Sequence, residues 1–277
     1  MFRKIFQLLF VVLLWMTATV ASAYDFKSGS LCYTIVSKSE RTVEVAYANA
    51  RHANKVVVPS EVNYDGKKWR VVGLGPDAFY DSVKLTELVL PSSIKYIAGG
   101  ALERCHELKQ IKLPSGVTLR TYALRNSGIT SIRVPGNVKW GSRHIGQLSN
   151  LPKVTSILLE EGIESVPDAA FQFDANLEYL TLPTSLRHIG RYAFVGCSAL
   201  TRLDIPVGVR TIGRLVDFGD CALKEIHVHW QDPIQIAGNT FPKDTYMNAV
   251  LYVPRGSKGN YRASVGWCRF KNIEEET

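Results

Sequence analysis

A unit of about 23 residues recurs along most of the chain, and its apolar positions predict the architecture. One regular copy carries Leu177-x-x-Leu180-x-Leu182-Pro183, then Leu186, Ile189-Gly190, Ala193-Phe194, Cys197 and Leu200. The next copy begins with Leu203-x-Ile205-Pro206. A fixed period of about 20 to 50 residues is typical of solenoids, in which each repeat forms one coil packed against its neighbours.

The repeat boundaries predict one short strand in each coil. They fall at Pro91, Pro114, Pro135, Glu160, Pro183 and Pro206, and the spacing is equal except for a shorter step to Pro135 and a longer step to Glu160. The apolar alternation before each boundary favours a strand, which ends because Pro lacks a backbone donor. We predict that the residues three positions before each boundary, together with Ile226 three positions before His229, form one buried column on neighbouring paired strands: Leu88, Ile111, Ile132, Ile157, Leu180, Leu203 and Ile226. Gly190 and Gly213 are expected to mark a sharp turn.

Both ends of the repeat array depart from the pattern, and both are interpreted as caps. Residues 24–72 are predicted to form an N-terminal β cap with a first irregular repeat, including a hairpin turn at Asp65-Gly66. Residues 73–229 hold the repeats. Residues 230–277 are predicted to form a last strand and a C-terminal cap covered by Trp267 and Phe270, with Glu274 to Glu276 solvated.

The N-terminal segment, residues 1–23, is typical of a secretory signal peptide. Arg3 and Lys4 precede an apolar run, and Ala21-Ser22-Ala23 offers a small-residue cleavage site. The run is shorter than the roughly 20 apolar residues of a membrane span. No Cys stands at the cleavage site to take a lipid, since the first Cys is Cys32. We expect an exported protein, secreted or at the cell surface of a bacterium, without a membrane span or lipid anchor of its own.

Motifs for catalysis or cofactor binding are missing from the sequence. We expect no enzyme, cofactor or metal: there is no Gly-rich phosphate loop and no zinc-protease signature, and His227-x-His229 on one strand face is a weak metal candidate. Cys105, Cys197 and Cys221 recur at related repeat positions, which favours buried, reduced thiols over a catalytic nucleophile. Cys197 and Cys221 come from successive coils and could approach each other, but column stacking alone does not give disulfide geometry.

The charges are unevenly distributed along the repeats. From Leu108 to Val154 there are eight basic residues and no acidic one, whereas Leu159 to Leu186 holds six acidic residues and no basic one. Stacking is expected to gather the basic residues, with Lys112 and Arg133 in one column as neighbouring like charges. The irregular repeat after Pro135 adds Trp140. The candidate binding residues are Lys109, Lys112, Arg133, Lys139, Trp140 and Arg143.

These residues point to an anionic partner, weakly bound and sensitive to salt. The alternative interpretations are two solvated charged faces and a buried Trp140. The partner is expected to be an extracellular protein or an anionic glycan, and no nucleic-acid partner is expected.

The repeat unit resembles the BspA-type bacterial leucine-rich repeats. The resemblance covers about Val56 to Ile273, and Leu251-Tyr-Val-Pro254 with Trp267-x-x-Phe270 looks like the C-terminal end of such proteins. It implies an α/β repeat fold: a right-handed leucine-rich-repeat solenoid with short parallel strands, few short helices or turns, and β-rich caps at both ends. The units at Pro114 and Pro135 depart from the family pattern because they lack Ala-Phe or differ in length.

The family is known from surface and secreted proteins of host-associated bacteria, some of which bind extracellular matrix proteins. The resemblance therefore implies a non-enzymatic, adhesion-type binding protein. A structural or assembly component of the bacterial cell envelope is the alternative, and an enzyme with a site built across coils is a third hypothesis.

Overall fold

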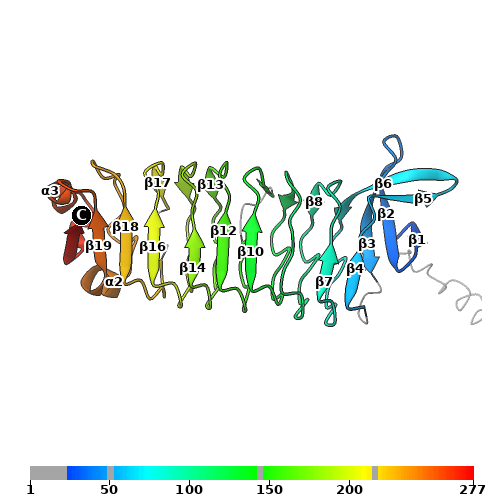
Figure 1. Cartoon of the computed structure of the whole chain (residues 1–277), viewed down its shortest axis with the longest axis horizontal. Coiled ribbons are helices and arrows are strands. Elements are labelled where there is room, and N and C mark those ends of the chain that lie inside the picture. The colour runs from blue at the N-terminus through cyan, green and yellow to red at the C-terminus, as the bar shows by residue number, and fades with distance from the viewer. Residues whose placement is uncertain (1–23, 49–52, 142–145, 214–217) are drawn as a thin grey trace, which may run out of the picture.

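The chain forms an elongated solenoid whose coils follow one another along the long axis (Figure 1). The computed structural model describes residues 24–48, 53–141, 146–213 and 218–277, so the predicted signal peptide lies outside the described residues. Strand β1 lies at one end of the molecule, and α3 and β20 lie at the other (Figure 1). The predicted solenoid of short parallel strands with few helices is confirmed.

One long side of the solenoid, here called the strand side, carries the strands that end at the repeat boundaries. It consists of β4 (Lys55–Val57), β7 (Glu87–Val89), β10 (Ser131–Val134), β12 (Ser156–Leu159), β14 (Tyr179–Thr181), β16 (Arg202–Ile205), β18 (Glu225–Val228), β19 (Val250–Val253) and β20 (Asn272–Glu275). All pairings among these strands are parallel. The predicted register is confirmed where Ile132 pairs with Ile157 and where Leu203 pairs with Ile226.

The ladder on the strand side is open at two places, so the prediction of one continuous column of paired strands is wrong. Residues 110–113 form no strand, and Ile111 is paired with neither Leu88 nor Ile132. Strands β14 and β16 belong to separate sheets, which leaves Leu180 and Leu203 unpaired with each other. Ile111 is still only 7% exposed, because burying a side chain does not require its peptide groups to lie in register. Leu180 is half-buried.

A second side carries short strands after each boundary. They are β8 (Tyr96–Ile97), β9 (Thr118–Leu119) and β11 (Lys139–Trp140), which continue from β6 (Lys67–Leu74), and then β13 (Ser165–Val166), β15 (His188–Ile189) and β17 (Thr211–Ile212). Gly190 follows β15, and a Cβ there would lie 2.5 Å from the backbone nitrogen of Asp168. Glycine is therefore required by the close approach of the neighbouring coil.

The third side consists of turns that are linked from coil to coil by backbone hydrogen bonds. The amide of Phe79 donates to Ala101 O at 2.8 Å, and the amide of Phe171 donates to Ala193 O at 3.0 Å. Leu102, Leu124 and Leu148 are fully buried in the Phe position of the repeats that lack Ala-Phe. Leu102 N keeps the same bond to Ala123 O at 2.9 Å, and Leu148 N to Ala170 O at 3.1 Å, so these two repeats retain the turn geometry.

Aromatic rings and thiols fill the interior of the later coils. Phe171, Phe194, Phe218 and Phe241 stack in succession, with ring centroids 5.5, 5.2 and 4.6 Å apart. The thiols of Cys105, Cys197 and Cys221 each donate to the backbone carbonyl of a Phe one coil earlier, at 3.1 to 3.2 Å. Cys105 and Cys197 are buried as predicted, whereas Cys221 is half-buried.

The two ends differ from the coils between them. At the N-terminal end, β1 (Phe26–Ser28), β2 (Leu31–Ser37) and β3 (Thr42–Ala48) form an antiparallel sheet, and β5 (Glu61–Tyr64) pairs with β6 as a hairpin. At the C-terminal end, α2 (Lys243–Asn248), α3 (Lys258–Ala263) and the 3-10 turn η1 (Trp267–Arg269) flank β19 and β20. Within the described ranges, no helix has the length and apolar character needed to cross a bilayer.

Candidate binding groove on the strand side

A groove of about 640 Å³ lies between β7 and β10, where the first opening interrupts the ladder. Leu88, Ile111 and Leu113 line it with side chains that are 5–7% exposed, so they belong to the core beneath. Lys112 and Arg133 are exposed on its rim. An apolar floor with a few polar groups at its edge is the usual composition of a binding pocket.

Ion pairs neutralise most of the charge around the groove. Arg133 Nε contacts Glu160 Oε1, and this hydrogen bond holds the pKa of the Glu160 carboxyl below its ordinary value. Glu87 is paired with Lys55 at 2.7 Å. In the part of the chain that the structure describes, Lys112 has no ion-pair partner. Glu160, from the acidic stretch, thus faces Arg133, so the expected stack of two uncompensated cations does not form.

The structure brings together only part of the predicted site. Lys112 and Arg133 line the groove, and Lys109 is exposed on the same coil as Lys112 but outside the lining. Lys139 and Trp140 form β11 on the second side, in a different sheet from Arg133. Arg143 lies outside the described residues. The expectation that stacking gathers the cations into one region is wrong, because they occupy different sides of the coil.

Trp140 contributes to the scaffold. Its ring is half-buried and packs against the core, and its indole nitrogen donates to the backbone carbonyl of Ser165 at 2.8 Å. Since this bond satisfies the polar atom of the ring, Trp140 links β11 to β13 across the two coils. The interpretation of Trp140 as a ligand-stacking residue is not supported by this position.

The other cations of the basic stretch are also engaged locally. Arg120 lies over the ring of Tyr96 at 5.1 Å, and Arg125 lies over the ring of Tyr122 at the same distance. Lys153 Nζ donates to the backbone carbonyl of His106 at 3.2 Å. These contacts hold the arginines against rings on the coil surface, away from the groove between β7 and β10.

The second opening of the ladder forms a smaller groove of about 470 Å³ between β14 and β16. Leu180, Thr181 and Val207 line it, together with Asp204 and His229. The nitrogen Nε2 of His229 lies 2.7 Å from Asp204 Oδ1, so the polar groups at this edge contact each other. Both grooves therefore mark places where neighbouring strands are unpaired.

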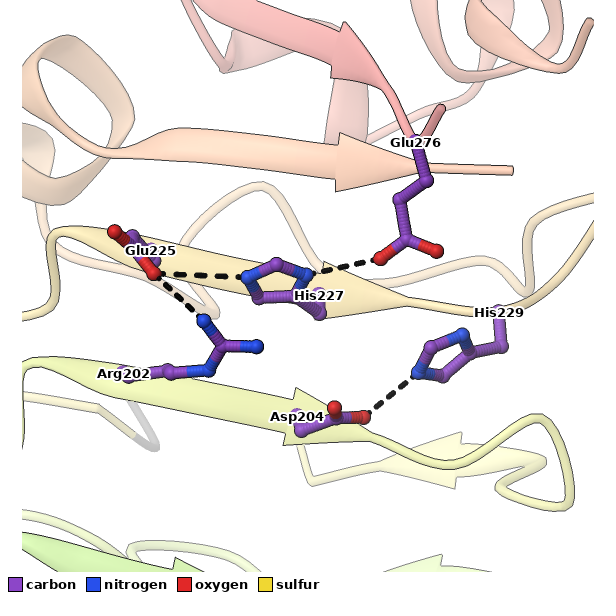
Figure 2. A network of polar contacts seen from close by, with 6 residues as sticks. All are labelled: Arg202, Asp204, Glu225, His227, His229 and Glu276. Carbon is purple, nitrogen blue, oxygen red and sulfur yellow. Dashed lines mark hydrogen bonds and ion pairs between the residues drawn. The ribbon is translucent and has the colours of Figure 1, made fainter. Parts of the chain in front are cut away.

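The end of the strand side carries a polar network around His227 (Figure 2). Arg202 pairs with Glu225 at 2.9 Å, Glu225 lies 3.7 Å from His227 Nε2, and His227 Nδ1 contacts Glu276 Oε1 at 2.9 Å. His227 also stacks on Tyr252 with a centroid distance of 4.5 Å. The prediction that the acidic tail is solvated is wrong for Glu276, which the network ties to β18.

Sequence reasoning missed the role of one buried acid, Asp174. It lies in the position of the thiol column, as far beyond Glu160 as Cys197 lies beyond Pro183. Its Oδ1 accepts the amide of Leu151 at 2.8 Å, while Oδ2 has no partner within the described residues. Burial raises the pKa of the Asp174 carboxyl well above its ordinary value. The equal spacing from the two boundaries is the signal that could have identified it.

The cysteines are unpaired, and the geometry around Cys105 does not favour a nucleophile. All five cysteines are described and none forms a disulfide. Burial raises the pKa of the Cys105 thiol to about 12, which disfavours the thiolate that a nucleophile requires. Among the described residues, no three His, Cys, Asp or Glu side chains lie where they could hold a metal ion together.

Comparison with solved structures places this fold among bacterial repeat proteins. A leucine-rich repeat protein from Bacteroides ovatus ATCC 8483 is 20% identical with a TM-score of 0.53, over 91% of this chain and 77% of that one. The T. pallidum protein TpLRR is 21% identical with a TM-score of 0.51, over 64% and 90%. A leucine-rich repeat protein from Eubacterium ventriosum ATCC 27560 is 19% identical with a TM-score of 0.52, over 68% and 48%.

Sequence identities at this level show that these proteins share a fold, and nothing about a shared role. A comparison with curated proteins finds no match. The model of the BspA type leucine-rich repeat region matches six copies, over residues 22–145 and 146–248. These ranges include the groove, the second side of the coils and most of the strand side. The chain therefore belongs to the BspA-type leucine-rich repeat family.

Proposed function

We propose that this chain is an exported, non-enzymatic binding protein of a bacterium, which recognises an extracellular protein or glycan through the groove between β7 and β10. The observation that carries the proposal is the opening of the ladder at residues 110–113. It gives the strand side a hollow with an apolar floor and an unpaired cation, Lys112, whereas the polar groups Asp204 and His229 at the second opening contact each other. The signal sequence and the family support export and an adhesion-type role.

The proposal includes two structural expectations. The coils wind with a right hand, and the sheet of β1 to β3 and the C-terminal helices act as caps that cover the first and last coils. A solenoid needs such terminal cover because its end coils would otherwise expose apolar surface. After cleavage of the leader, the mature chain is secreted or held at the cell surface.

The test uses the mature protein, residues 24–277, on arrays of matrix proteins and glycans. Lys112→Glu reverses the unpaired charge at the groove, and Lys139→Glu makes the same change on the second side as the matched control. We expect K112E to weaken binding to the recognised ligand at least tenfold and K139E to leave it unchanged. Equal affinities of the two variants for every ligand on the arrays would refute the proposal.

A further inference from the structure

Residues 110–113 lie between β7 and β10, which belong to separate sheets, and their backbone is unpaired among the described strands. Within the described ranges, none of these four residues takes part in a backbone–backbone hydrogen bond. The preceding residue, Lys109, still accepts the amide of Thr130 at 2.9 Å, so the ladder is lost only within this segment. Backbone N–H and C=O groups require partners, which a ligand strand would supply here.

The side chains of this segment alternate as they do in a strand. Gln110 and Lys112 are exposed, whereas Ile111 and Leu113 are buried. Strand β16 has the same alternation of exposed and buried residues. Since Ile111 and Leu113 point into the core and yet line the groove, the backbone between them forms part of the groove floor. The segment is thus prepared for strand pairing and lacks only the paired strand.

The groove surface fits a peptide better than a polyanionic glycan. A sulfated polymer needs several cations in a row. Of the two cations among the described residues that line the groove, Arg133 is already paired with Glu160, and only Lys112 has no ion-pair partner. Val89, which also lines the groove, is 40% exposed and offers an apolar contact. An extended peptide supplies alternating side chains together with backbone donors and acceptors.

We propose that the groove binds an extended, acidic segment of a partner protein by strand addition along residues 110–113, with Lys112 pairing with a carboxylate of that segment. The inference rests on the proposed binding function and names the ligand class of the same site. Backbone hydrogen bonds supply affinity in this mode, and the side chains at alternate positions supply specificity. The free cation selects Glu or Asp on the outward face.

The experiment uses a library of short peptides that combine Glu with Val, Ile and Thr, tested against the mature protein. The tightest peptide is then prepared with alternate backbone nitrogens methylated, which removes donors and keeps every side chain. We expect methylation to weaken binding at least tenfold, K112E to do the same, and K139E to have no effect. Hydrogen exchange should show that the bound peptide protects the amides of residues 110–113.

The outcomes separate this inference from the proposed function. Strand addition is overturned if no peptide binds, if methylation leaves the affinity unchanged, or if the four amides stay unprotected. The groove remains a binding site if an anionic glycan such as heparin binds the parent protein but not K112E. If K112E and K139E also bind every glycan and protein probe with equal affinity, both strand addition and the proposed function are refuted.

Discussion

The buried carboxyl of Asp174 predicts a stability that falls as the pH rises. The side chain is 0% exposed, one of its oxygens accepts the amide of Leu151, and burial raises its pKa. In the unfolded chain an Asp ionises near pH 3.9. Between that pH and the raised native pKa, the native state holds one proton that the unfolded state has released. Stability from this site is therefore fully present below the unfolded pKa and is lost as pH rises.

The slope of the free energy of unfolding against pH gives the magnitude of this effect. One proton of difference changes the free energy of unfolding by about 1.4 kcal/mol per pH unit, for as long as the native carboxyl stays protonated. Asp174→Asn keeps the oxygen that accepts from Leu151 and removes the ionisation. As the pH rises above the unfolded pKa, we expect the variant to gain stability relative to the parent by up to about 1.4 kcal/mol per pH unit, because the parent alone carries this loss.

The assay is urea unfolding of the parent and the variant at several pH values from 4.5 to 7.5, followed by circular dichroism. Comparing the two proteins at each pH cancels the titration of every other group. Asp65→Asn, at the exposed hairpin turn between β5 and β6, makes the same chemical change on the surface and serves as the control. Parallel pH curves for the parent and D174N would refute the argument that Asp174 is neutral in the native state.

Three further predictions concern the interior of the coils. Phe194→Ala, which removes a ring stacked between two others, should lower the free energy of unfolding by about 3–5 kcal/mol; Val207→Ala at an exposed position is the control, and a loss below about 1 kcal/mol would contradict the packing. Gly190→Ala should cost about 1–3 kcal/mol in the same urea assay, because its Cβ would meet Asp168 N at 2.5 Å; an unchanged midpoint would show that the coils separate easily. Thiol counting in denaturant without reductant should find all five cysteines free, and a loss of two thiols would reveal a disulfide.

The repeat period is sufficient to predict side-chain columns and insufficient to predict backbone pairing. The pairing of Ile132 with Ile157 follows directly from their equal distance to a boundary. The same apolar pattern occurs at Gln110-Ile111-Lys112-Leu113, yet this segment is paired with neither neighbouring strand. The step that follows it, from Pro114 to Pro135, is the shortest between boundaries, yet Ile132 and Ile157 stay paired across the longest step, from Pro135 to Glu160. The second opening follows a step of the regular length, so the spacing of the boundaries explains neither opening.

The candidate site was only partly predictable for a related reason. The charge count along the chain identified Lys112 and Arg133, which do line the groove. It could not identify the neutralising partner, because Glu160 reaches Arg133 from the next coil and belongs to the acidic stretch. It also combined Lys139 with these residues, although a position after the boundary falls on the second side. The separation of two residues in the sequence shows neither the side of the coil on which each lies nor the residue that each contacts on the adjacent coil.

The opening between β7 and β10 lies on only one side of the solenoid. Strands β8 and β9 remain paired on the second side, and the amide of Leu102 still donates to Ala123 O at 2.9 Å on the third. On the strand side, widening the groove would therefore act only on the bond from Thr130 N to Lys109 O, and it would bend the long axis about the two intact sides. Because each coil contacts only its neighbours, a small rotation here is carried rigidly to both tips. We therefore expect the width of the groove and the curvature of the long axis to change together. Small-angle scattering can follow this change when a ligand is added.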